Sequence, residues 1–206
     1  MADSKHNTLY TIGHSNHTIE AFISLLKSHR ITAVADVRSA PYSRYCPQFN
    51  KDNLAASLKA ANIEYIFLGK ELGGKPNDKS CYENGRVNLK LIAKRKEFKQ
   101  GLERLLIESS KHRIAIMCAE KDPLRCHRTF LICRHIRDNF HIRHIMADGT
   151  VEEHNETERR LLNMLKARPT LFEPAKAERE LIEQAYDEVI SYEESIRTTG
   201  KRSVSD

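Results

Sequence analysis

Short apolar runs alternate with segments of helical periodicity up to about residue 150. The runs have the length and residue types of buried strands and lie at 9–12, 31–37, 63–68, 114–118 and 142–146. Between them, apolar residues recur every three or four positions at 19–26, 51–62, 98–106 and 126–137, with Thr18 available to cap the first helix. This alternation predicts an α/β fold: a single domain with a mostly parallel central sheet of about five strands and helices on both faces.

The chain after Gly149 has a different pattern, more helical and more charged. It predicts one helix at 151–167 and another at 178–195, followed by a frayed end. We therefore expect the α/β domain at 1–155 and a C-terminal helical extension at 156–206. The apolar stripe of the second helix predicts docking on the domain or, alternatively, a contact in an oligomer.

The segment from 69 to 91 interrupts the alternation after the third predicted strand. It is rich in glycine and carries no long apolar run. Because structureless loops of this length are uncommon in compact domains unless they have a function, we expect a mobile lid or a binding loop here.

The composition of the chain limits which cellular compartment and which binding partners we expect. No run approaches the roughly 18 apolar residues of a membrane span, and the N-terminus lacks a secretory apolar segment, so we expect a cytoplasmic protein without a membrane partner. The five cysteines contain no C-x-x-C pair, which favours reduced thiols. The net charge of +6 favours an anionic small molecule or a nucleic acid as partner.

Polar or reactive side chains follow every predicted strand. Along the chain they are Gly13, His14 and Ser15; Asp36 and Arg38; Glu71, Gly73 and Gly74; Cys118 and Glu120; and Asp148 with Gly149. The carboxyl ends of parallel strands meet at one edge of a sheet, which is where α/β proteins bind ligands. We therefore expect one shared polar cleft at this edge.

Acid–base chemistry on an anionic substrate is the function that this set favours. We predict an enzyme, a hydrolase or transferase, acting on a phosphate-bearing nucleotide or a nucleic acid. The expected catalytic residues are Glu120, His14, His127, Cys118 and Asp36. The expected substrate-binding residues are Ser15, Arg38, Ser43, Arg44, Gly73, Gly74, Cys126, Arg128 and Asp148, among which Arg38 and Arg128 would clamp the anion.

Two alternatives remain open. The first is a nucleic-acid-binding module without catalysis that contacts phosphates through basic residues such as Arg44, Lys51 and Arg86. The second is a thiol-dependent or metal-binding enzyme that uses Cys118 and Cys126. A phosphate-binding thiol cradle is disfavoured, because Glu120 and Asp122 would repel the phosphate.

Zinc is the metal that these thiols would select. Cys118, Cys126 and His127 offer suitable ligand atoms, but adjacent residues such as Cys126 and His127 rarely both reach one tetrahedral ion. The fragments Cys-Ala-Glu and Pro-x-x-Cys also resemble parts of the zinc deaminase signature, in the wrong context for it. The sequence therefore requires no cofactor, and we expect no metal ligand.

Five motifs occur in order between about residues 9 and 153. They are Thr11-Ile-Gly-His-Ser15, Asp36-Val-Arg-Ser-x-Pro-x-Ser43, Leu68-Gly-x-Glu-Leu-Gly-Gly74, Cys118-x-Glu120 with Pro123-x-x-Cys-His-Arg128, and His144-Ile145 with Asp148-Gly149. Together they resemble the domain-of-unknown-function family 488. The resemblance implies an α/β domain with a shared cleft and a cytosolic setting, but no established reaction.

Overall fold

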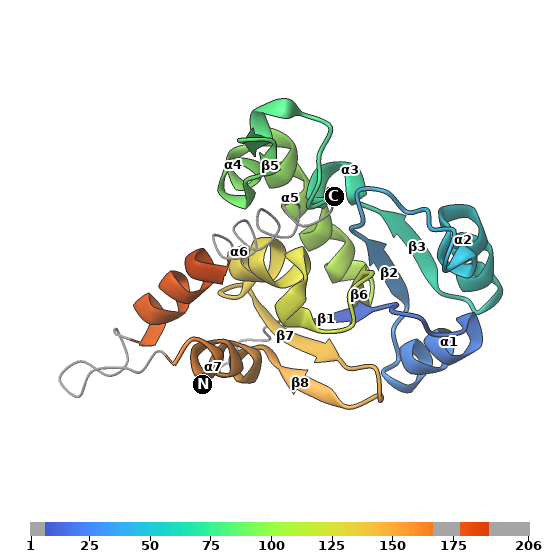
Figure 1. The fold of residues 1–206 in the computed structure, drawn as a ribbon. Helices are drawn as coiled ribbons and strands as arrows, with labels where there is room; N and C mark the ends of the chain where they lie inside the picture. The colour runs from blue at the N-terminus through green and yellow to red at the C-terminus, as the bar shows by residue number, and fades with distance from the viewer. Residues whose placement is uncertain (1–6, 167–177, 190–206) are drawn as a thin grey trace, which may run out of the picture. The chain divides into compact units, whose positions relative to one another are not determined.

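The computed structural model describes residues 7–166 and 178–189. Contacts divide the chain into two compact units, Met1–His154 and Asn155–Asp206. The first unit is built on a six-stranded sheet with the order β3-β2-β6-β1-β7-β8 (Figure 1). The strands are β1 (Asn7–Gly13), β2 (Ala33–Asp36), β3 (Glu64–Phe67), β6 (Ile114–Cys118), β7 (Phe140–Ile145) and β8 (Val151–Glu153). Only β8 is antiparallel to its neighbour in this sheet, so the predicted α/β class with a mostly parallel sheet is confirmed.

Helices cover both faces of the sheet. They are α1 (Ile19–Ser28), α2 (Lys51–Ala60), α3 (Gly69–Leu72), α4 (Leu89–Lys94), α5 (Lys96–Lys111) and α6 (Arg134–Ile136). A further helix, α7 (His154–Met164), belongs to the second unit from Asn155 onward. One hydrophobic core joins one face of the sheet to α3, α4, α5 and α6, and a second joins the other face to α1 and α2. Thr18 caps α1 as expected, with its hydroxyl accepting a hydrogen bond from the Ala21 amide at 3.2 Å.

Successive side chains of a strand point to opposite faces of the sheet, so a strand that is covered on both faces contributes residues to both hydrophobic cores. In β6, Ile116 packs on the side of α5 and Met117 on the side of α1. All five residues of β6 are buried because both faces of this central strand are covered. That burial explains the uninterrupted apolar run from which the strand was predicted.

The segment 69–91 is not the irregular loop expected from its sequence. It contains α3, a short hairpin of β4 (Tyr82–Glu83) and β5 (Arg86–Val87), and α4. Asn84 and Gly85 form the hairpin turn with positive φ angles of 52° and 75°. Such Asn-Gly turns match the twist of paired strands, and this is the physical reason that the segment forms a hairpin where a structureless loop was expected. The role of this segment as a lid or a binding loop stays a prediction.

Two expected helices also differ from prediction. The segment at 151–167 begins with the edge strand β8, and α7 starts only at His154. The segment at 126–137 begins as a π-helix at Arg128–Cys133 before it continues as α6. A π-helical turn adds one residue to the helical repeat and is frequent at functional sites.

The described residues of the second unit include α7 from Asn155 onward and a helix at 178–189. Within it, the buried Tyr186 hydroxyl donates to Glu158 at 2.9 Å, and Arg159 lies 4.0 Å from Glu178. The predicted continuation of the last helix to 195 and the predicted frayed end lie outside the described residues. No helix in the described ranges is long and apolar enough to cross a membrane.

Candidate functional site

The loops after β1 and β6 continue the pairing of their strands beyond the sheet. The His14 amide donates to the Cys118 carbonyl, and the Ser15 amide donates to the Ala119 carbonyl, each at 2.9 Å. Gly13 permits this close approach, because a Cβ atom at this position would lie 1.9 Å from the Glu120 carbonyl oxygen. The motifs that end β1 and β6 are therefore held side by side at the carboxyl edge.

We expect Gly13→Ala to lower the free energy of unfolding by about 2–3 kcal/mol, because the added methyl group would meet rigid backbone. Urea denaturation followed by circular dichroism measures the change. A variant as stable as the wild type would show that the two loops do not approach this closely in solution.

Four residues with metal-binding or nucleophilic side chains meet at this edge, and we call them the Cys–His–Glu cluster: Cys118, Glu120, Cys126 and His127. The two thiols donate to the same oxygen of Glu120, from Cys118 at 2.8 Å and from Cys126 at 3.1 Å. The Nδ1 atom of His127 lies 3.6 Å from the sulfur of Cys118 and 4.0 Å from that of Cys126. All four ligand atoms lie within 4.8 Å of one another.

A tight turn after β6 brings the second half of the cluster back to the first. Asp122 begins the turn by accepting from the Leu124 amide at 3.0 Å. Cys126 is extended and His127 is already helical, so their side chains do not point to opposite sides as they would in a strand. This change of backbone conformation lets adjacent residues approach one point, which the sequence does not lead us to expect.

The imidazole of His127 has a fixed orientation. Its Nε2 atom donates to the Val37 carbonyl at 3.1 Å, which leaves Nδ1 facing the two sulfur atoms. A Cβ atom on Gly74 would lie only 2.7 Å from the ring, so the backbone at Gly74 packs directly against it. His127 is thus positioned by the residue that follows β2 on one side and by the segment after α3 on the other.

Arg128 supplies a buried positive charge beside the thiols. Its side chain is 1% exposed and donates to the carbonyls of Glu120 at 2.7 Å and Lys121 at 3.3 Å. No carboxylate pairs with it among the described residues, whereas its backbone amide donates to the Cys126 sulfur at 3.4 Å. The guanidinium therefore fixes the loop and balances negative charge on sulfur.

The two thiols have different acidities. Burial raises the pKa of Cys126, but the hydrogen bond from Cys118 and the positive charges of Arg128 and His127 outweigh it and hold this pKa well below its usual range. The hydrogen bond to Cys126, together with burial, raises the pKa of Cys118. Burial alone would lower the pKa of His127, but the Cys126 thiolate raises it. Cys126 is thus the more acidic of the two thiols, and its lowered pKa goes together with the raised pKa of His127 beside it.

Asp36 and Arg38 form a separate buried pair. The Asp36 carboxylate accepts from Nε and Nη2 of Arg38 at 2.9 and 2.7 Å and from the Tyr65 hydroxyl at 2.8 Å. Arg38 also donates to the Phe49 carbonyl at 2.8 Å. Asp36 is fully buried and Arg38 is 6% exposed, so in this structure the two side chains pair with each other. The catalytic role expected of Asp36 and the anion-binding role expected of Arg38 stay predictions.

His14 belongs to this pair rather than to the cluster. Its Nδ1 atom donates to the Ser15 carbonyl at 2.8 Å, its Nε2 atom accepts from Arg38 at 3.2 Å, and its ring stacks on Phe49 with centroids 4.3 Å apart. Burial, with the charge of Arg38, lowers the pKa of His14 to about 4. Both ring nitrogens therefore have partners in this structure, and the role of His14 as a proton carrier stays a prediction.

Three other expected binding residues shape the loops around the cluster. Ser15 adopts a φ of 48° next to the end of β6, and the Ser43 hydroxyl accepts from the amides of Tyr45 and Cys46 at 3.2 and 3.3 Å. Gly73 packs against Ser39. Ser43 and Gly73 thus hold the backbone of these loops in place, while Ser15 and Ser43 remain partly exposed.

Arg44 and Asp148 are not in contact with the cluster. Arg44 is exposed on the loop after β2. Asp148 lies in the turn between β7 and β8, where hydrogen bonds from Thr150 lower its pKa. Asp148 thus stabilises a turn. Among the residues expected to bind the substrate, Arg44 has an exposed cationic side chain.

Three groups at this edge were not expected from the sequence: the Tyr65 hydroxyl, the Phe49 ring and the Val37 carbonyl. Tyr65 places a hydroxyl group within the mostly apolar sequence of β3. This hydroxyl is a signal from which a polar contact with a neighbouring strand could have been predicted. The Val37 carbonyl is backbone and leaves no signal in the sequence.

An open hollow of about 710 Å³ lies at the opposite, amino edge of the sheet. Residues that line it include Lys59, Glu64 and His112. It contains none of the cluster residues, and we place the candidate site at the carboxyl edge, where thiol, carboxylate and imidazole groups converge.

Comparison with known proteins gives a single match. A family model described as "Domain of unknown function DUF488" matches residues 18–134, which include all four cluster residues. No curated protein and no solved structure matches the chain.

Proposed function

The chain belongs to the family of domain of unknown function DUF488, and from the geometry of its Cys–His–Glu cluster we propose that it is a zinc-dependent enzyme. Cys118, Cys126 and His127 hold the metal, and Glu120 is the acid or base at its open side. The observation that carries the proposal is the convergence of four ligand atoms within 4.8 Å.

The distances fit zinc. In a tetrahedral site with zinc bonds of about 2.3 Å to sulfur and about 2.0–2.1 Å to nitrogen, the two ligand atoms lie about 3.6 Å apart. His127 Nδ1 lies 3.6 and 4.0 Å from the two sulfur atoms. The Glu120 oxygen, at 2.8 and 3.1 Å from the sulfurs, is at hydrogen-bond distance and must move outward when metal replaces the thiol protons.

The surroundings also suit a metal. A histidine that ligates a metal almost always donates its other N–H to a carbonyl or carboxylate, as His127 does to Val37. With two thiolates and the Glu120 carboxylate, a zinc ion would leave one excess negative charge. Arg128, which lacks a carboxylate partner among the described residues, balances that charge.

An open coordination position separates catalytic from structural zinc sites. Cys118 and Cys126 are buried, whereas Glu120 is exposed, so solvent or substrate reaches the cluster from the Glu120 side. Zinc in such a site supplies Lewis acidity for hydrolysis. The Glu120 carboxylate takes a proton from the attacking water and returns it to the leaving group, while Arg128 holds the Glu120 backbone.

A thiol nucleophile is less well supported. The lowered pKa of Cys126 suits a nucleophile, but the residue is only 1% exposed and its thiol donates to Glu120. A nucleophile must reach its substrate, so this burial favours the metal ligand. The positive net charge and exposed cations such as Arg44 and Arg125 support an anionic substrate, a nucleotide or nucleic acid.

The proposal is tested by Glu120→Gln in the zinc-loaded protein. Hydrolysis of nucleotides and oligonucleotides, followed by mass spectrometry, should fall by about a hundredfold to ten-thousandfold while zinc remains bound by three ligands. Glu103→Gln, at an exposed position of α5, is the matched control and should be fully active. Unchanged turnover in Glu120→Gln would remove this residue from the mechanism.

A further inference from the structure

The loop that follows β2 exposes two aromatic rings. Tyr42 is 70% exposed and Tyr45 is 96% exposed, with the exposed Arg44 between them. Within the described residues, no side-chain hydrogen bond or ring contact involves any of the three. Two exposed rings on either side of an exposed guanidinium form a patch of the kind that a ligand can cover.

The loop that carries these rings is anchored. The Ser43 amide donates to the Asn50 side chain at 2.7 Å, and the Lys51 amide donates to the Pro41 carbonyl at 2.9 Å. The Ser43 hydroxyl accepts from the next two free amides of the turn. A ligand that stacks on the rings therefore does not have to order the loop, which reduces the entropy lost on binding.

The charge of this segment is uniformly positive. Between Asp36 and Asp52 the chain carries three basic residues, Arg38, Arg44 and Lys51, and no acidic residue. Arg38 is paired with Asp36, and Lys51 lies over the ring of Phe67. Arg44 is thus the cation of this loop that is available to an anionic ligand.

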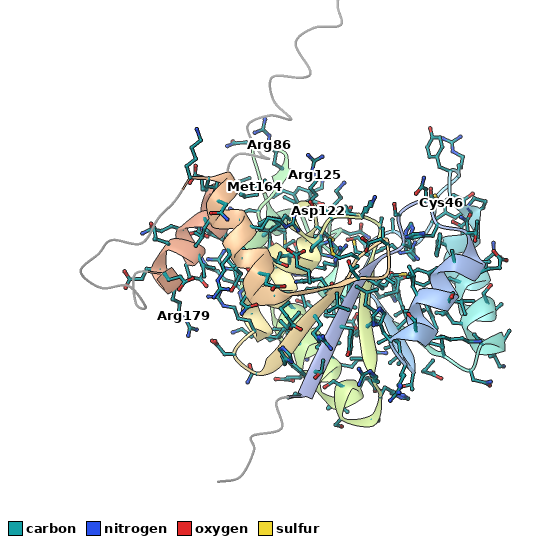
Figure 2. All side chains as sticks on the ribbon, turned by 90° about the horizontal axis from the view of Figure 1, so that it is seen from below. Cys46, Arg86, Asp122, Arg125, Met164 and Arg179 are labelled. Atoms are coloured by element: carbon teal, nitrogen blue, oxygen red, sulfur yellow. The ribbon has the colours of Figure 1, made fainter. Side chains whose placement is uncertain are left out.

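The loop lies beside the Cys–His–Glu cluster. At one end, the Cys46 thiol, labelled in Figure 2, donates to the Ser15 carbonyl at 3.7 Å, and the Ser15 amide donates to Ala119 next to Glu120. At the other end, Ser39 packs against Gly73, whose neighbour Gly74 packs against His127. Two short chains of contact therefore join the two ends of this loop to the site.

We propose that Tyr42, Arg44 and Tyr45 form a binding platform for single-stranded nucleic acid. Two bases stack on the tyrosine rings, and Arg44 contacts the phosphates between them. Every base presents an aromatic face for stacking once it is unpaired, whereas a duplex covers these faces. The platform itself is independent of metal, and only the inference that the bound strand is the substrate of the cluster rests on the proposed function.

Binding of fluorescent oligothymidylate, measured by anisotropy with the full chain, tests the platform. We expect Tyr42→Ala and Tyr45→Ala each to weaken binding about tenfold, and the phenylalanine variants to keep the affinity within about twofold. Arg44→Ala should weaken binding and reduce its dependence on salt by about one phosphate contact. The control is Leu106→Ala, at a 52% exposed position of α5, which should bind like the wild type.

Two measurements separate this proposal from the zinc proposal. Cys118→Ser should lose zinc and still bind the oligonucleotide, and the tyrosine variants should keep their zinc. Binding that is absent, that is equally strong for duplex DNA, or that is insensitive to both tyrosines would overturn the platform. Equal binding of polyglutamate at the same tyrosines would also overturn it, by assigning the surface to an acidic protein segment.

Discussion

Replacement of Cys126 by serine should abolish stable zinc binding. The wild-type chain, reconstituted under reducing conditions, should retain one zinc ion per molecule through gel filtration. A full zinc site is worth about 10–16 kcal/mol, so the loss of one of the three protein ligands should lower the affinity for zinc by roughly a thousandfold. Elemental analysis and competition with a chromogenic chelator measure the loss, and Cys118→Ser should behave in the same way.

The other cysteines provide matched controls. Cys46 and Cys133 are reduced and lie outside the cluster, so Cys46→Ser and Cys133→Ser should keep the metal. Removal of zinc with a chelator should also lower the melting temperature of the wild type, because a ligand that binds only the folded state stabilises it. Equal zinc loss in Cys46→Ser and Cys126→Ser would assign the metal to a different place.

Asp36→Asn should destabilise the fold by about 3–5 kcal/mol. The substitution keeps the size of the side chain but leaves the buried guanidinium of Arg38 without its counter-charge. Urea denaturation measures the free energy of unfolding. Asp52→Asn, in the exposed first turn of α2, is the control and should change it by less than about 0.5 kcal/mol.

A second substitution separates structure from catalysis at Asp36. Replacing Asp36 and Arg38 together with apolar residues should recover part of the lost stability, because it removes the uncompensated charge. Zinc affinity should change little in either variant, since neither residue touches the cluster sulfurs. Lost turnover with an unchanged free energy of unfolding would instead support the catalytic role that the sequence predicts for Asp36.

The sheet was predictable because its signals are local. A run such as Ile114–Cys118 is apolar throughout only when both faces of a strand are covered, and its bounds match the prediction. The hairpin at Asn84 and Gly85 also has a local signal, which the glycine-rich context hid. The edge strand β8 is only three residues long, which is too few to show an alternating pattern. The prediction therefore included these residues in the helix that follows.

Part of the candidate site was also predictable from a local sequence signal. Cys118, Glu120, Cys126 and His127 lie within ten residues at the end of one strand, so the sequence itself marks them as a group. The pairing of Arg38 with Asp36, and of Arg128 with two backbone carbonyls, depends on packing between segments. The residue types alone do not distinguish an arginine that binds substrate from one that supports a loop.

X-ray absorption at the zinc edge is the most direct measurement of the central claim. For the wild-type protein we expect two sulfur neighbours at about 2.3 Å and two nitrogen or oxygen neighbours at about 2.0–2.1 Å, with one sulfur fewer in residual metal bound by Cys126→Ser. A spectrum with nitrogen and oxygen neighbours only, or a reduced protein that binds no zinc, would contradict a metal site at Cys118, Cys126 and His127.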